Sequence, residues 1–128
     1  MVTTLAVGGR NAAADAIVDL IDIGTADANG DLVIWTVGDA EVATLAMSNP
    51  AFGDAAVGVA TAAAISDDAS ATGGLADYFT LQNRDNAEVI RGDCGTSGAE
   101  LNLSSLTIGA LDVVTVSALT LTVPATSD

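Results

Sequence analysis

The side chains that could take part in chemistry are almost all carboxylates. The chain of 128 residues has 17 aspartates and glutamates, three arginines, no lysine and no histidine, and its net charge at pH 7 is −14. Without histidine, no Ser-His-Asp or Cys-His arrangement can form, and the commonest zinc ligand is missing. Without lysine, there is no Schiff-base residue and no P-loop lysine. Acid chemistry by pairs of carboxylates is the catalytic chemistry that remains open.

Two pairs of carboxylates have the spacing to act together on a glycosidic bond. Asp67 precedes Asp68 directly, and Asp39 lies two positions before Glu41. Such pairs supply the acid and the base or nucleophile of glycoside hydrolysis. A sugar cleft also needs aromatic platforms, and the core requires most of the four aromatic residues of this chain. We therefore expect solvated loop acids at these positions and a protein that is not an enzyme.

A third group of acids resembles a calcium loop. Asp27, Asn29 and Asp31 alternate as oxygen ligands do, with Gly30 in the turn between them. The EF-hand pattern needs glycine at its sixth position and a bidentate glutamate at its twelfth, where this chain has Gly38. The sequence leaves open whether Asp27, Asn29 and Asp31 bind a cation or face water, and we expect no cofactor.

The single cysteine and the three arginines limit the reactions and the kinds of binding partner that we expect for this chain. Cys94 cannot form an intramolecular disulfide, and we expect a buried, unreactive thiol because only Arg91 is near enough in sequence to lower its pKa. Arg10, Arg84 and Arg91 are too few and too scattered to bind a phosphate backbone in a chain of this charge. We expect neither nucleic acid nor a membrane as partner, and arginines that pair with carboxylates within or between subunits.

The composition also bears on location. Residues 1–9 hold no basic residue that could start a secretory signal, and no run approaches the roughly 20 apolar residues of a membrane span. We therefore expect a soluble, unprocessed chain. Its surplus of carboxylates fits two origins equally: a surface adapted to high salt, where screening suppresses repulsion, or a genome that avoids lysine codons.

One amphipathic helix is expected near the start of the chain. Asn11 can cap a helix that begins at Ala12, and Gly24 can end it after Ile23. Helical spacing places the apolar side chains on one face and the acids on the other, toward solvent. The apolar face is Ala13, Ile17, Leu20 and Ile21, and the acidic face is Asp15, Asp19 and Asp22.

The rest of the chain predicts strands with short connections. Residues 32–37 and 42–47 form one hairpin, and residues 75–82 and 87–91 form a second around the turn at 83–86. Further strands are expected over 55–65 and over 111–123, the latter with a bulge near Ser117, where the apolar alternation changes phase. The segments 66–74 and 92–98 are expected to be loops.

Together these elements predict a single domain over residues 1–128. It is mainly β, an antiparallel β-sandwich or partly open barrel of six to eight strands with the N-terminal helix packed on it. Trp35 and Phe52 are expected in the core.

Several segments in order give the chain a family resemblance. They are residues 11–21, the Asn-Pro-Ala-Phe-Gly run that opens residues 49–60, Tyr-Phe-Thr-Leu at 78–81, residues 95–103, and the Thr-rich strand at 114–125. In these the chain resembles small virion structural proteins of tailed phages and prophages. Residues 24–31 are more acidic than the family pattern, which tends to carry lysine there, and this departure extends the comparison to tailed viruses of haloarchaea.

The resemblance implies a particle component and brings no catalytic residues. An outer capsid decoration protein is the first expectation, and a component of the tail or head-tail junction is the alternative. A small calcium- or carbohydrate-binding β module is the remaining alternative. The implied partners are the major capsid protein or other virion proteins and further copies of the chain, with a trimer as one symmetry. The implied location is the virion, after synthesis in the host cytoplasm.

Overall fold

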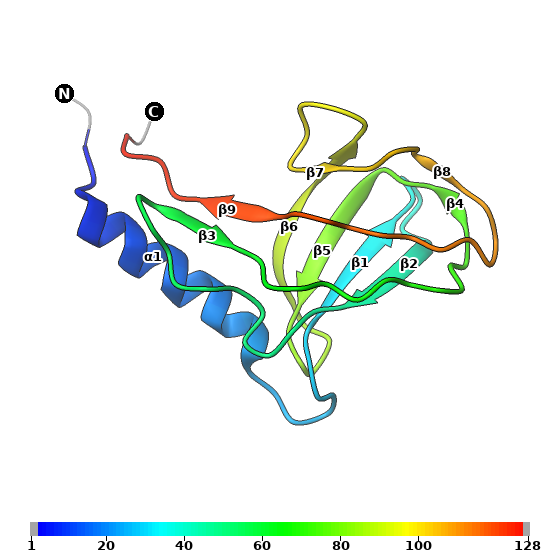
Figure 1. The fold of residues 1–128 in the computed structure, drawn as a ribbon, viewed down its shortest axis with the longest axis horizontal. Helices are drawn as coiled ribbons and strands as arrows, with labels where there is room; N and C mark the ends of the chain where they lie inside the picture. The colour runs from blue at the N-terminus through cyan, green and yellow to red at the C-terminus, as the bar shows by residue number, and fades with distance from the viewer. Residues whose placement is uncertain (1–2, 127–128) are drawn as a thin grey trace.

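The computed structural model describes residues 3–126 and shows one helix and nine short strands in that range. The chain is mainly β, as predicted, with a strongly curled sheet beside the N-terminal helix (Figure 1). The elements are α1 (Val7–Asp19), a 3-10 turn (Leu20–Asp22), β1 (Asp31–Trp35), β2 (Glu41–Ala46), β3 (Val59–Thr61), β4 (Gly74–Leu75), β5 (Tyr78–Gln82), β6 (Glu88–Gly95), β7 (Leu101–Asn102), β8 (Thr107–Ile108) and β9 (Thr120–Thr122). The described helix is not long and apolar enough to cross a membrane.

The helix begins five residues earlier than predicted. Its first residue is Val7, and Ala6 stands at the N-cap without a side-chain hydrogen bond. Asn11 is therefore not the cap. It lies within the helix, and its Oδ1 accepts a hydrogen bond of 2.8 Å from the backbone N–H of Gly58. The Asn11 side chain, which the local sequence predicts as a helix cap, instead makes a tertiary contact with the turn before β3.

The faces of the helix also differ from the prediction. Ile21 is buried as expected, but the other buried positions are Ala14 and Val18, and Leu20 is 48% exposed. The chain tightens into a 3-10 turn at Leu20, which has three residues per turn and so rotates the following side chains relative to an α-helix.

Two of the helical acids do not simply face water. Asp15 accepts the N–H of Ala55 at 2.7 Å, and Asp22 accepts the N–H of Ala51 at 2.9 Å. These bonds tie the helix to the segment before β3 by satisfying backbone donors that no strand pairs.

Both predicted hairpins are present and together make most of the main sheet. β1 pairs with β2, β5 pairs with β6, and β1 and β5 are antiparallel neighbours in the order β2-β1-β5-β6-β7. The strand pair β6 and β7 is parallel. Leu32, Ile34, Phe79 and Leu81 are buried at alternate positions on the two central strands, and they define the inner face of the sheet.

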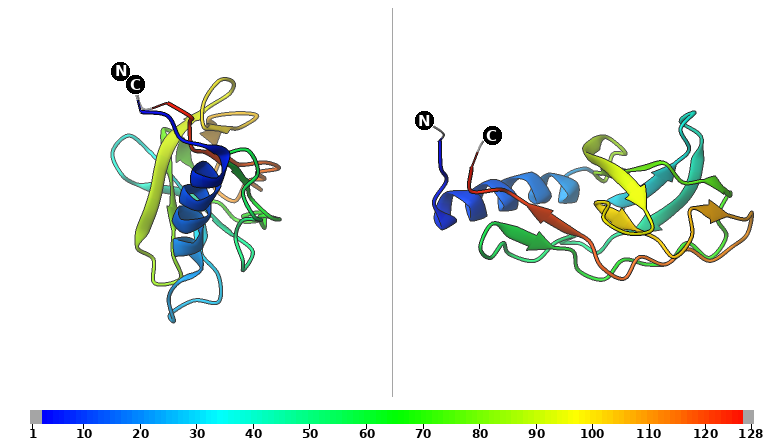
Figure 2. Two further views of the ribbon diagram at one scale, coloured as in Figure 1. Left: turned by 90° about the vertical axis from the view of Figure 1, so that its left-hand side faces the viewer. Right: turned by 90° about the horizontal axis from the view of Figure 1, so that it is seen from above.

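Irregular segments cover this inner face instead of a second large sheet. The pair β4-β8 is an ordered part of this covering, and the extended chain between it and the pair β3-β9 crosses the main sheet (Figure 1). Turned views show α1, β3 and β9 lying together to one side, away from the main sheet (Figure 2). The core between the layers includes Met47, Phe52, Ala60, Leu103, Val116 and Leu119.

Three predicted segments need correction. Residues 55–65 and 111–123 form only the short strands β3 and β9, since their pairing is confined to three positions. The phase change in the last segment is confirmed, because Val114 and Val116 are buried and the next buried residue is Leu119. Gly92 lies within a strand, not a loop, because β6 runs to Gly95. A Cβ at Gly92 would stand 2.6 Å from the Phe79 ring, so glycine is needed there for packing.

Candidate functional site

The outer face of the main sheet carries a row of aromatic and charged side chains. Trp35 of β1 is directly opposite Tyr78 of β5, and Tyr78 is opposite Asp93 of β6. Arg91 is two positions from Asp93 and so shares its face. By register these side chains lie on the face opposite to that of Leu32, Ile34, Phe79 and Leu81. The register therefore gathers the only tryptophan, the only tyrosine and one of three arginines on the side of the sheet away from the core. We call Trp35, Tyr78 and Arg91 the aromatic row.

The aromatic row is a stack across three strands. The rings of Trp35 and Tyr78 are 6.3 Å apart at an interplanar angle of 15°, and the Arg91 guanidinium lies 4.5 Å from the Tyr78 centroid. The Trp35 indole N–H donates to the Thr80 hydroxyl at 3.0 Å, and Thr80 is buried although it is on the outer face. Stacking and cation–π contact hold the three side chains upright as one unit.

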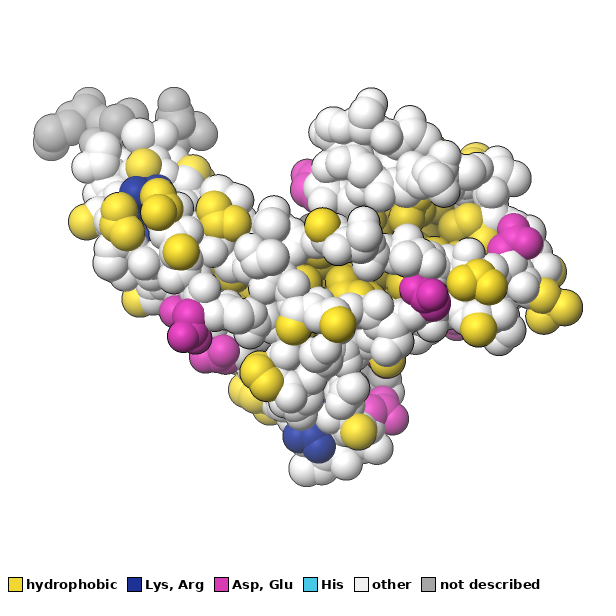
Figure 3. Space-filling model, viewed as in Figure 1, with side chains coloured by type: hydrophobic (Ala, Val, Ile, Leu, Met, Phe, Trp, Pro, Cys, Tyr) yellow, Lys and Arg dark blue, Asp and Glu magenta, His cyan; other side chains and the backbone are white. Residues whose placement is uncertain are grey.

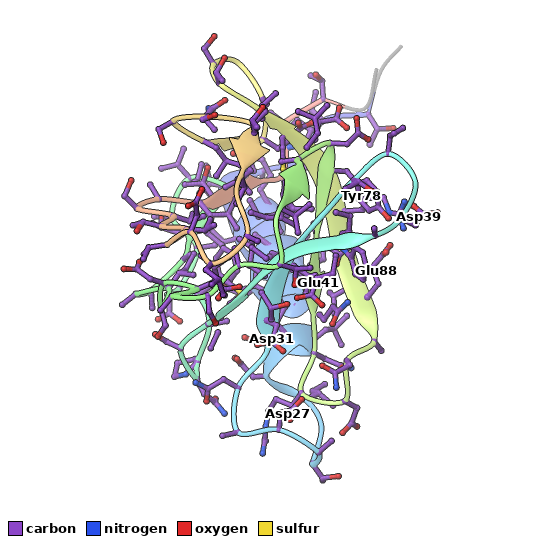
Figure 4. All side chains as sticks on the ribbon, turned by 90° about the vertical axis from the view of Figure 1, so that its right-hand side faces the viewer. Asp27, Asp31, Asp39, Glu41, Tyr78 and Glu88 are labelled. Atoms are coloured by element: carbon purple, nitrogen blue, oxygen red, sulfur yellow. The ribbon has the colours of Figure 1, made fainter. Side chains whose placement is uncertain are left out.

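Carboxylates bind two members of the stack, Tyr78 and Arg91. The Tyr78 hydroxyl donates a 2.7 Å hydrogen bond to Asp39, which raises the pKa of Tyr78 above its usual value because phenolate would lose the bond and face the carboxylate. Arg91 donates to Glu88 at 2.9 Å, and this bond raises the pKa of the guanidinium. Asp39 reaches Tyr78 from the turn between β1 and β2, where it adopts φ 66°. These acids lie on one side of the molecule (Figure 4).

The surroundings of the row are acidic. Asp31, Glu41 and Asp93 share the outer face by register, in addition to Asp39 and Glu88. Arg91 is the single cation among them. The face therefore presents an apolar, upright stack inside a negatively charged rim.

Trp35 is the residue that the sequence interpretation misplaced. It was expected in the core, yet it is half-buried on the outer face. The burial pattern of β1 explains the error: Leu32, Val33 and Ile34 are all buried, so apolar residues occupy both faces of this central strand. Strict alternation from Leu32 and Ile34 would have placed Trp35 outside. Phe52 is buried as predicted.

The structure assigns separate partners to the candidate catalytic carboxylates. Asp39 binds Tyr78, and Glu41 accepts the Thr44 hydroxyl at 2.7 Å. Asp68 accepts the backbone N–H of Thr44 and that of Ser70, each at 2.9 Å.

The candidate cation ligands do come together. Asp27, Asn29 and Asp31 line one shallow surface recess with Ala28 and Ala46. Partial burial, and then the charge of Asp27, raise the pKa of Asp31. Asp27 and Asp31 with the Asn29 amide are the residues that could hold a cation. Within residues 3–126, no group of three or more Asp, Glu, His or Cys side chains could hold a metal ion.

The arginines act in three different ways. Arg91 makes the one ion pair found among the described residues. Arg84 donates from Nε to the Asp27 carbonyl at 2.8 Å, so it binds loop backbone instead of a carboxylate. Arg10 reaches the Val57 carbonyl at 3.4 Å. The expected pairing with acids within the chain thus holds for Arg91 alone.

Cys94 is half-buried against the core and unpaired. Burial, and then the charges of Asp77 and Asp93, raise its thiol pKa to about 12. This environment suppresses the thiolate and agrees with the expected unreactive thiol.

Comparison of the chain with protein families, with curated proteins and with solved structures finds no match to any of them.

Proposed function

We propose that the chain is a structural protein of a tailed virus, acting on the outer capsid as a decoration protein through protein contacts. The observation that carries the proposal is the aromatic row. Tryptophan, tyrosine and arginine dominate the energetic centres of protein interfaces. Here one of each is placed on an open sheet face in a chain with only four aromatic residues, where core packing would have claimed them first.

The stack fits a protein partner better than a sugar. A sugar ring binds on an open aromatic face, but the Arg91 guanidinium lies over the Tyr78 ring at 4.5 Å, and Trp35 stands beside that ring with 6.3 Å between the centroids. The row therefore offers ring edges, the indole flank and a guanidinium, which suit the mixed apolar and polar surface of a protein. This supports decoration over the carbohydrate-binding alternative.

The edge of the main sheet at β2 already has hydrogen-bond partners, so we expect a partner to bind the outer face of the sheet and not this edge. β2 is an edge strand, yet Gly73 donates to the Val42 carbonyl at 3.0 Å and Ser66 donates to the Ala46 carbonyl at 2.8 Å. The Asp68 carboxylate accepts the outward N–H of Thr44 between them. A partner strand cannot add to β2 while these bonds persist.

Charge favours the exterior of a particle. A chain of net charge −14 is repelled by a packaged genome, whereas it can coat the outside of a shell without attracting nucleic acid. The acidic rim around the row is suited to a partner surface that carries lysine or arginine.

The test is to locate the protein in purified particles of the virus whose genome encodes it. Electron microscopy with mass spectrometry should find many copies spread over the shell. Copies confined to the tail would support the tail alternative instead, and absence from particles would refute both.

Variants then test the face. Arg91→Ala removes the guanidinium of an exposed side chain without adding a carboxylate to the acidic rim, and it should reduce rebinding to protein-depleted particles at least tenfold. Leu75→Ser, an equally exposed position on β4 in the covering layer, should rebind normally. Equal rebinding by both variants would show that the aromatic row is not part of the contact with the particle.

A further inference from the structure

The acids of this chain are unevenly distributed in a way that becomes meaningful only in three dimensions. Residues 1–14, 55–66 and 113–127 contain no aspartate or glutamate, and with residues 42–53 they are the longest such segments of the chain. Apart from Asp128, the last residue, all 17 acidic side chains lie within residues 15–54 and 67–112. Along the chain these gaps are far apart, and none of them is unusual alone.

The fold brings one part of each of these three segments, residues 3–10, 56–59 and 123–126, to one end of the molecule. β3 pairs with β9, α1 packs on β3, and Leu5 donates to the Ala125 carbonyl at 2.7 Å. This end projects away from the main sheet, and both chain termini lie there (Figure 1). We call residues 3–10, 56–59 and 123–126 the acid-free end.

The surface of the acid-free end is apolar. Leu5 is 42% exposed, Val7 is 45% exposed and Val57 is 65% exposed, and Arg10 is the only charged residue among the described residues 3–10, 56–59 and 123–126. In Figure 3, yellow and dark blue side chains share the upper part of the left-hand lobe, and magenta ones begin lower down. Asp15 is the first acid along the helix, about 12 Å from Val7 at 1.5 Å per residue.

Two local features at this end run against the usual residue preferences. Gly8 and Gly9 lie in the first turn of α1, where glycine weakens a helix, yet a Cβ at either would meet nothing within 4 Å. Val57 has φ 51°, a left-handed conformation that is rare for a β-branched residue. It forms a two-residue turn with Gly58, and such turns favour Asn-Gly. A smooth, apolar surface is maintained here against local preference.

We propose that the acid-free end is the surface through which copies of this chain associate, like end against like end. Two molecules of charge −14 repel each other through nearly every other surface. Contact at this end places the acidic sheet regions on opposite sides of the rotation axis, as far apart as the fold allows. The exposed glycines permit close approach of the two helix starts, and the valines and leucine are buried between chains.

The charge distribution favours a second copy of the chain over a different protein as the partner at the acid-free end. An acid-free surface lowers the repulsion between two acidic partners, and a second copy is by definition as acidic as the chain. The inference does not rest on the proposed virion function, because self-association is measured on the purified protein alone.

The test compares two matched substitutions by analytical ultracentrifugation across a range of protein concentrations. Val57→Asn should weaken association at least tenfold while raising thermal stability, since asparagine relieves the left-handed backbone. Leu111→Asn is the control. Leu111 also has a positive φ, of 70°, is 76% exposed, and lies in the segment after β8 at the other end of the molecule. Its substitution should leave association unchanged.

The possible outcomes distinguish an effect of the substitution on folding from an effect on the contact between copies. A wild-type chain that stays monomeric at every concentration would overturn the proposal, as would equal loss of association in both variants. A stabilised but monomeric Val57→Asn chain beside an oligomeric Leu111→Asn chain would establish the interface. Molar salt should strengthen the wild-type contact, because it screens the remaining repulsion and leaves apolar burial intact.

Discussion

Asp68→Ala should be the most informative single test of how the sheet edge is closed. The Asp68 carboxylate accepts two backbone N–H groups, that of Thr44 on the edge strand β2 and that of Ser70 in its own loop. Alanine leaves both donors without this acceptor. The Thr44 site is part-buried, so water replaces the lost bond poorly, whereas the Ser70 site is exposed and hydrates readily.

The magnitude follows from these two environments. Losing a charge-assisted bond to a part-buried donor costs about 1.5 to 2 kcal/mol, and losing the exposed one costs about 0.5 kcal/mol. Asp68→Ala should therefore lower the free energy of unfolding by about 2 kcal/mol, or Tm by roughly 6 °C for a chain of this length. Asp68→Asn retains one carbonyl acceptor and should lose about half as much.

Asp67→Ala is the matched control. It removes the same charge one position earlier, from an exposed side chain that makes no hydrogen bond among the described residues. Urea denaturation should place it within about 0.5 kcal/mol of wild type. Amide hydrogen exchange gives a second measurement, since the Thr44 amide should lose protection in Asp68→Ala only. Equal stability of the two alanine variants would refute the edge-closing role of Asp68.

Three further predictions use titration. Cys94, with a pKa of about 12, should react with a thiol reagent at pH 8 roughly a thousandfold more slowly than in the urea-unfolded chain. Because its folded pKa lies above the unfolded value near 9.0, stability should also fall as pH rises from 9 toward 12, and Cys94→Ala should remove that fall. Tyr78 is the only tyrosine, so an ultraviolet titration should show it ionising above pH 10.0, and Asp39→Asn should lower its pKa; an unchanged midpoint would contradict the hydrogen bond. The pKa of Asp31 is raised by burial and by Asp27, so ionisation of Asp31 opposes folding, and Asp31→Asn should raise Tm at pH 7 and narrow the gap to wild type at pH 3; a lower Tm at pH 7 would show that the carboxylate is needed.

Local sequence signals were sufficient where an element depends on its immediate neighbours. The hairpin at 83–86 was predicted from its Asn-Arg-Asp-Asn loop between two strand-like segments. In the structure Asn83 Oδ1 accepts hydrogen bonds from the backbone N–H groups of Asp85 and Ala87, which asparagine commonly does within its own loop. The β1-β2 hairpin followed in the same way from apolar runs around Gly38-Asp39. The mainly β class and the presence of one N-terminal helix needed nothing beyond such patterns.

Signals failed where a distant segment competes for the same side chain. Asn11 looks like a helix cap and instead binds Gly58, and Asp22 looks like a solvent-facing acid and instead binds Ala51. Asp85, which seems an ordinary turn residue, accepts the N–H groups of Thr25 and Ala26, and these bonds lower its pKa. No periodicity encodes such partners, because each depends on how the chain returns to itself.

The sequence by itself determined the chemistry that this protein lacks, its fold class and its strongly acidic character, because these depend on residue types and short-range spacing. The tertiary structure alone decided which side chains act together. Pairing β1 with β5 stacks Trp35 on Tyr78 from positions 43 residues apart, and pairing β3 with β9 joins acid-free segments that composition averages over. Register and packing are long-range properties, and both candidate surfaces of this molecule arise from them.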